Sequence, residues 1–170
     1  MLTLTPQPLT PEGFAPFGDV IAVSGNTAEL INAGHTQKFT DLAGIDTTAE
    51  GGRTAVHIYR SQPLSLPLEI RVMERHPLGS QAFMPLHNGP FLVIVAPAGG
   101  ELKSDEVQAF LSNGQQGVNL RRGTWHHFQV SLLQVSDYLV IDRMGPGINF
   151  EERSLSPPLL IDNLDQASFS

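Results

Sequence analysis

The sequence contains no cysteine, which excludes disulfides, thiolate zinc sites and cysteine nucleophiles. Any bound metal ion must therefore be held by histidine, carboxylate or amide oxygen. Basic residues are also scarce: ten Lys and Arg stand against 17 Asp and Glu, giving a net charge of -7 and a pI near 5.2. Nucleic acids and anionic membranes are not expected as partners, because their surfaces attract clustered Lys and Arg.

Long hydrophobic runs are lacking as well. No stretch approaches the roughly 18 apolar residues of a membrane span, and the N-terminus lacks the positive segment and apolar run of an export signal. We therefore expect a soluble cytoplasmic protein. At 170 residues the chain fits one domain, which would bury about two thirds of the surface of its unfolded form. We expect a single domain over residues 1–170, with 153–170 as a peripheral C-terminal tail.

The 16 glycines and 13 prolines divide the chain into short segments, a pattern typical of an all-β sandwich or barrel with few short helices. A helical turn is expected at 11–14. Residues 24–52 are polar and predict a loop or an edge strand, which could cover the mouth of a cavity. Residues 104–110 fit either a short helix or a strand. Strands are expected at 19–23, 53–60, 68–76, 81–86, 91–96, 117–120, 125–132 and 135–143.

The most informative stretch is 68–81. On a regular strand, alternate side chains share a face, so Leu68, Ile70, Val72, Glu74 and His76 would point to one side. The three aliphatic residues require a core, which would place the Glu74 carboxylate and the His76 imidazole in the same interior. An unpaired charge is costly there, whereas a functional or metal-bound group is tolerated.

A set of metal-ligand types extends this stretch. The spacing Glu74-x-His76 puts two ligands on one strand face, and a turn returns Gln81 beside them. His126, which follows a turn at Gly123, supplies a fourth group from a partner strand. Imidazole, carboxylate and amide ligands suit Ni, Zn, Mn or Fe without thiolate. Taken singly, either histidine would more often be a core residue, Glu74 would pair with Arg71 or Arg122, and Gln81 would bond the backbone.

The same residues resemble the cupin motifs in a degenerate form. Glu74 stands at the first histidine of H-x-H, His76 matches the second, and Gln81 stands at the motif glutamate. In the second motif, P-x-G-x2-H, Gly123 and His126 match and Arg121 replaces the proline. Within the cupins, the runs ERHPLGSQAFMPL, FLVIVAP, NGQQGVNLRRGTWHHF and DYLVIDR closely resemble bacterial ureidoglycolate lyases, over about Leu9 to Glu152.

This resemblance implies a cupin-like, jelly-roll β-barrel that acts as a homodimer and cleaves ureidoglycolate to glyoxylate and urea in allantoin degradation. It also implies a divalent cation, with Ni²⁺ the ion usually linked to the family, and Glu74, His76, Gln81 and His126 as its ligands here.

The residue types suit this reaction. Ureidoglycolate is a hemiaminal that carries a carboxylate. Its elimination needs a base for the hydroxyl proton, an acid for the departing urea nitrogen and a cation for the carboxylate. His76, His126 and Glu74 are the catalytic candidates.

The cation for the carboxylate is sought among basic residues near the expected cavity. Arg60 is expected to face inward at a strand end, Arg122 precedes His126, and Lys38 lies in the expected cover, so these three are the substrate-binding candidates. His57 is expected at the surface or an interface. Asp142 and Arg143 are expected to pair structurally, and Trp125 and Phe128 to pack.

Two other functions fit the same pattern. One is a metal-dependent cupin oxygenase or isomerase, which would need a fuller set of His and carboxylate ligands than Glu74 and Gln81 leave. The other is a cupin that only binds a small carboxylate as a sensor, which usually accompanies a DNA-binding domain. A chain of 170 residues has little room for such a domain.

Overall fold

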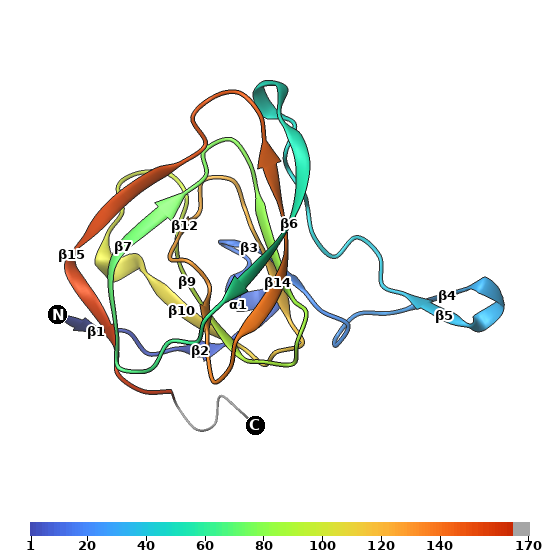
Figure 1. Cartoon of the computed structure of the whole chain (residues 1–170), viewed down its shortest axis with the longest axis horizontal. Coiled ribbons are helices and arrows are strands. Elements are labelled where there is room, and N and C mark those ends of the chain that lie inside the picture. Colours follow the sequence, from blue (N-terminus) through green and yellow to red (C-terminus); the bar gives the residue numbers. More distant parts are fainter. Residues whose placement is uncertain (165–170) are drawn as a thin grey trace.

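A computed structural model describes residues 1–164 and consists almost entirely of β-structure around a barrel (Figure 1). An eight-stranded sheet has the order β1-β15-β7-β12-β9-β10-β2, with β13 also paired to β9; a five-stranded sheet has the order β3-β11-β8-β14-β6. The larger sheet comprises β1 (Leu2–Thr3), β2 (Gln7–Pro8), β7 (Leu68–Arg75), β9 (Phe91–Ala96), β10 (Gln108–Ser112), β12 (Trp125–His126), β13 (Val130–Ser131) and β15 (Glu151–Ile161). The smaller comprises β3 (Gly18–Ile21), β6 (Arg53–Ser61), β8 (Gln81–Pro85), β11 (Gly117–Leu120) and β14 (Ser136–Met144).

The expected all-β, cupin-like fold with few helices is confirmed. The helices are α1 (Pro11–Phe14) and the 3₁₀ turns η1 (Asn32–Gly34), η2 (Ala49–Gly51) and η3 (Ser104–Glu106). The segment 104–110, which fitted either helix or strand, contains η3 followed by the start of β10. The strand expected at 125–132 is divided into β12 and β13, since residues 127–129 leave the ladder.

The C-terminal segment differs from the expected peripheral tail. Residues 151–161 form β15, the longest strand, which pairs with both β1 and β7. Leu155, Leu159 and Ile161 are buried. The two prolines of the strand, Pro157 and Pro158, suggested a loose tail, but they fall within a register shift where no ladder donor is required. Residues 165–170 lie outside the described part of the chain.

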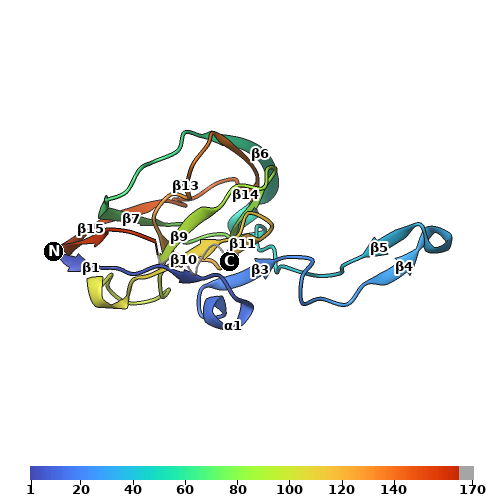
Figure 2. The ribbon, with the colours of Figure 1, turned by 90° about the horizontal axis from the view of Figure 1, so that it is seen from below.

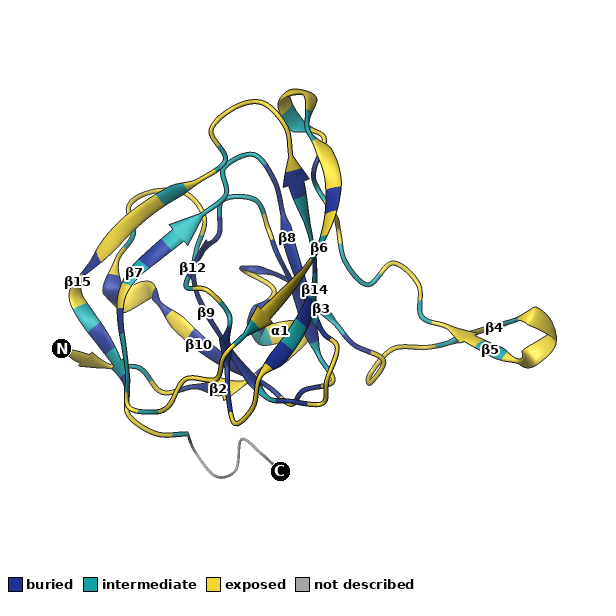
Figure 3. Cartoon of the chain, in the orientation of Figure 1, coloured by how far each residue is buried: buried dark blue, intermediate teal, exposed yellow. Residues whose placement is uncertain are grey.

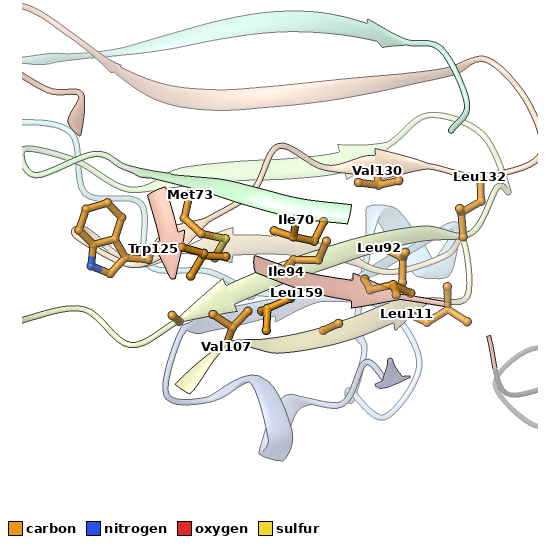
Figure 4. Close-up of a cluster of buried hydrophobic side chains, with 14 residues drawn as sticks. Ile70, Met73, Leu92, Ile94, Val107, Leu111, Trp125, Val130, Leu132 and Leu159 are labelled. Carbon is orange, nitrogen blue, oxygen red and sulfur yellow. The ribbon is translucent and has the colours of Figure 1, made fainter. Parts of the chain in front are cut away.

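Two groups of buried apolar side chains lie on opposite sides of the larger sheet. The inner cluster, between the two sheets, contains Phe14, Phe17, Phe91, Phe110, Phe83, Tyr138 and Val140 among others. The outer cluster contains Ile70, Met73, Leu92, Ile94, Trp125, Leu155, Leu159 and Ile161 among others (Figure 4). Strand β9 is buried throughout (Figure 3), and its neighbouring residues alternate between the two clusters, as expected for a strand buried on both sides.

The expected single row of side chains along β7 is wrong at its N-terminal half. Leu68 and Ile70 pack with the outer cluster, as does Met73, whereas a regular strand would put Ile70 and Met73 on opposite faces. The reversal lies where the ladder with β15 changes register: Val72 pairs with Ser154, but Ile70 pairs with Leu159. Beyond this point Glu74, and not Met73, faces the barrel interior.

Strand β6 also has the opposite orientation to the one expected. Val56 and Ile58 are 64% and 57% exposed on the outer face of the smaller sheet. His57 and Tyr59 point inward instead, where His57 bonds Asp142 and the Tyr59 ring contacts Phe83. Arg60 shares the outer face with this apolar pair, so the inward orientation expected for Arg60 and the surface position expected for His57 are both reversed.

Residues 24–52 form an arm and a rim. The hairpin of β4 (Glu29–Ile31) and β5 (Thr36–Lys38) projects away from the barrel (Figures 1 and 2). The returning chain is fastened to the barrel by Arg143, which is 5% exposed. Its guanidinium donates to the carbonyl oxygens of Ala49, Glu50 and Pro146 at 2.7–3.4 Å. Arg143 was expected to pair with Asp142. It bonds the rim instead.

Candidate active site

Glu74, His76 and His126 converge at the end of β7. His126 on β12 is the direct ladder partner of Glu74, and the rings of His76 and His126 have centroids 5.1 Å apart. One ligand atom from each of the three residues lies within 4.8 Å of the others. A cavity of about 510 Å³ opens beside them, lined by Tyr59, Arg60, Ser61, Glu74, His76, Gln81, Phe83, Phe128 and Gln129.

The His126 side chain is buried with a free lone pair. Its Nδ1 lies 3.2 Å from the carbonyl oxygen of His127, which can only accept, so Nδ1 carries the hydrogen and Nε2 does not. Nε2 is buried and has no hydrogen-bond partner among the described residues. Burial above all, and then the charge of His76, lowers the pKa of His126 from 6.5 to about 3. His126 is therefore a neutral base or ligand at physiological pH.

His76 is held at both ring nitrogens. Nδ1 lies 2.9 Å from the carbonyl oxygen of Asn149, and Nε2 lies 3.1 Å from Oε1 of Gln81. The Asn149 side chain also accepts from the backbone N–H of Leu78 at 2.8 Å, which fixes the loop after β14 against the turn after β7. The ring orientation of His76 is thus set by a loop about 70 residues away in sequence.

The Glu74 carboxyl has a raised pKa. Burial raises its pKa, the positive charge of His76 opposes that rise, and the nearby Glu152 adds to it. The His126 Nδ1 atom is 3.9 Å from Glu74 Oε1, which is too long for a hydrogen bond. Glu74 therefore retains acceptor capacity for a substrate or a cation.

The residue set fits a divalent cation. Nε2 of His126 is an unpartnered lone pair in a buried site, and His126 converges with the Glu74 carboxylate and the His76 imidazole, which in turn contacts the Gln81 amide oxygen. Such a donor set suits borderline divalent ions. Gln81, predicted as the fourth ligand, is 5% exposed and reaches the same place through its contact with His76.

The three predicted substrate-binding residues lie in different places. Arg60 lines the cavity, but its side chain is 71% exposed and makes two hydrogen bonds to Asp137 at 2.8 and 2.9 Å. Its expected inward orientation is therefore wrong, because β6 presents that face to solvent.

The other two are not brought into the cavity of the same chain. Arg122 bonds Asp46 at 2.7 and 3.0 Å, an ion pair of the rim. Lys38 lies on the projecting arm, so the arm does not form the expected cover over this cavity (Figure 1). Both were chosen by closeness in sequence to a motif or an expected lid, which does not determine closeness in space.

Sequence reasoning missed several residues of the site. Tyr59 lines the cavity, and burial, Asp142 and Glu74 raise its pKa, in that order. The alternation of His57 and Tyr59 on one strand face was a usable signal. Phe128, taken for packing, is 53% exposed at the cavity. Asn149 lies in an irregular loop and gave no periodic signal.

The fold and the centre together define a class: a cupin-like β-barrel enzyme with a histidine–carboxylate site. The family model for ureidoglycolate lyase matches residues 1–162. Proteins named ureidoglycolate lyase are similar throughout: one from Burkholderia mallei is 50% identical over 159 residues (94% of this chain and 93% of that protein). One from Pseudomonas fluorescens is 49% identical over 152 residues (89% and 91%), and one from Azotobacter vinelandii 47% over 152 (89% and 92%). The chain belongs to the ureidoglycolate lyase family, which confirms the resemblance noted in the sequence.

The lowered pKa of His126 predicts acid sensitivity. Between pH 6.5 and about 3 the unfolded chain binds a proton at this residue that the folded protein does not. The free energy of unfolding should therefore fall as the pH falls from 6.5, by at most about 1.4 kcal/mol per pH unit from this group. His126→Gln should reduce that slope, measured by urea denaturation between pH 7.5 and 4.5. The exposed His35→Gln variant is the control, and equal slopes in wild type and His126→Gln would contradict the prediction.

Proposed function

We propose that this chain is a ureidoglycolate lyase that eliminates urea from ureidoglycolate and leaves glyoxylate, within allantoin degradation in the cytoplasm, and that it is a single catalytic domain. The observation that carries the proposal is the meeting of Glu74, His76 and His126 beside a cavity of about 510 Å³, which Glu74 and His76 line, in a member of this family. The names of the relatives supply the substrate class.

Each step of the elimination has a residue to serve it. The hydroxyl of the hemiaminal carbon loses its proton, the C–O bond becomes the aldehyde C=O, and the C–N bond breaks as the nitrogen gains a proton. In a site without a cation, Glu74, which lines the cavity and has a raised pKa, accepts the hydroxyl proton, and His126 lies beside it as its direct ladder partner. His76, whose two nitrogens face acceptors, supplies a proton to the urea nitrogen.

A divalent cation has a place in the same proposal, with Ni²⁺ as the candidate from the family resemblance. Glu74, His76, Gln81 and His126 would hold it, and it would act as a Lewis acid on the hydroxyl and carboxylate oxygens. His126 is then a ligand, and the remaining acceptor capacity of Glu74 serves for the hydroxyl proton. Tyr59 and Arg60 line the cavity and are the groups for the substrate carboxylate, which would replace Asp137 as the partner of the Arg60 guanidinium.

The reaction itself can be tested by product analysis. Purified protein given ureidoglycolate should release urea and glyoxylate in equal amounts. His126→Ala should lower the rate at least about a hundredfold without unfolding the chain, because it removes one of the three groups that converge at the site. His35→Ala, an exposed histidine on the arm, should retain full activity. Ammonia as the direct nitrogen product would contradict the lyase, and an oxygenase, isomerase or carboxylate sensor would release no urea.

The role of the cation can be tested by its removal. Dialysis against a chelator should lower activity, and Ni²⁺ should restore it with a stoichiometry near one ion per chain, measured by metal analysis. Glu74→Gln should weaken Ni²⁺ binding at least about tenfold in calorimetric titration, because an anionic ligand becomes neutral. Full activity in metal-free protein would contradict the requirement while leaving the lyase activity intact.

We also propose that the protein is a homodimer. Support comes from β6, a nine-residue edge strand whose outer face exposes Val56 and Ile58. Long apolar edge strands are normally covered in native proteins. The projecting hairpin adds support, because an isolated two-stranded hairpin is marginally stable in water unless it packs against something.

Sedimentation tests this assembly. Wild-type protein should sediment as a dimer, and Ile58→Asp should shift it toward monomer while its circular dichroism is unchanged, because a charge would be buried at the interface. Ile148→Asp, at a residue 84% exposed outside β6, should remain dimeric. A wild-type monomer at micromolar concentration would contradict the proposal.

A further inference from the structure

A line of hydrogen bonds connects the inner side of the smaller sheet to His76. The His57 ring on β6 contacts Asp142 Oδ1 on β14 at 2.9 Å. Asp142 Oδ2 accepts from Nε2 of Gln81 on β8 at 3.2 Å, and Gln81 Oε1 lies 3.1 Å from Nε2 of His76. Gln81 is buried, and the Asp142 side chain is 16% exposed. The three strands are neighbours in one sheet, so the line crosses directly from strand to strand.

The Gln81 amide could occupy this position in two ways. Its oxygen and its nitrogen have nearly the same shape, so packing alone does not distinguish the two orientations. Only the polarity of its neighbours does so. An ionised carboxylate accepts hydrogen bonds and cannot donate them, so Asp142 requires the NH₂ end of the amide, and the oxygen is left facing His76.

We propose that Asp142 is a positioning residue of the lyase reaction, which acts by holding the Gln81 amide with its oxygen toward His76. This rests on the proposed function. Nδ1 of His76 is committed to the carbonyl oxygen of Asn149, so a reversed amide would present N–H to Nε2 of His76 and the ring would become an acceptor there. Asp142 therefore keeps the amide oxygen of Gln81, and not its N–H group, directed at Nε2 of His76.

A purely structural role for Asp142 is the competing interpretation, since its contact with His57 is shorter than its contact with Gln81. The two roles predict different results for conservative variants. Asp142→Asn can keep its oxygen toward Gln81 and donate its NH₂ to an unprotonated nitrogen of His57. It should therefore retain kcat/KM within about threefold.

Removing the acceptor should have a larger effect. Asp142→Leu should lower kcat/KM about tenfold to a hundredfold, the range usual when a partner that orients an active-site group is lost. His57→Leu removes the other contact of Asp142 and should change kcat/KM less than about threefold. A loss in His57→Leu as large as that in Asp142→Leu would overturn the proposal in favour of the structural role.

An exchange of partners gives the sharpest test. Gln81→Glu places a carboxylate against Asp142, and the two repel each other, so activity should fall strongly. In the double variant Asp142→Asn with Gln81→Glu, the asparagine amide can donate to one carboxylate oxygen while the other faces His76. The double variant should be at least about tenfold more active than Gln81→Glu alone, and additive losses would overturn the proposal. A structural role for Asp142 predicts no such rescue.

A measurement without substrate separates this proposal from the function on which it rests. In ¹H–¹⁵N spectra of the substrate-free protein, Asp142→Leu should shift the ring signals of His76, and Asp142→Asn should shift them much less. If Asp142→Leu does not fold, Asp142→Ser replaces it in both measurements. Unchanged His76 signals would overturn the positioning role whatever the enzyme does. Shifted signals in a protein that releases no urea would leave it intact and reject only the reaction.

Discussion

The site depends on the register shift between β7 and β15. The larger sheet must bury Ile70 and Met73 in the same outer cluster, and a strand can do so across an odd number of residues only by interrupting its alternation. The interruption lies opposite Pro157 and Pro158, which lack the N–H groups of a regular ladder. The next residue pair after this break is therefore reversed, and Glu74 faces His126 inside the barrel instead of packing against Trp125.

Much of this arrangement follows from sequence. Short segments between glycines and prolines predicted an all-β barrel, and the spacing of Glu74, His76, Gln81 and His126 predicted that they would meet, which they do. The expected face of the aliphatic residues was wrong, however. A continuous inward row from Leu68 was assumed, whereas the aliphatic half of the strand faces the other way. The four residues were still grouped correctly, because the alternation is regular from Glu74 to His76 and the turn that follows returns Gln81 beside them.

The remaining features could not be read from local pattern. The orientation of β6 depends on which side of the smaller sheet meets a polar cavity, and an aliphatic pair such as Val56 and Ile58 does not specify that. The expected inward orientation of Arg60 was wrong for the same reason. The contacts of His76 with Asn149, and of Asp142 with Gln81, join residues 61–73 positions apart, and long-range pairs of this kind leave no periodic trace in one sequence. The two fixed orientations, of the imidazole and of the amide, come from tertiary structure alone.

Arg143 secures the rim of the barrel through backbone carbonyl oxygens, with no acidic side chain bonded to it within residues 1–164. Its nearly buried guanidinium is surrounded by backbone carbonyl oxygens of Ala49, Glu50 and Pro146. These carbonyl dipoles belong to the main chain, so substituting a side chain does not remove them. Salt screens their interaction with the guanidinium only weakly, because the site is buried. Side chains on the rim can therefore be substituted without loss of this attachment, provided that Arg143 is retained beneath them.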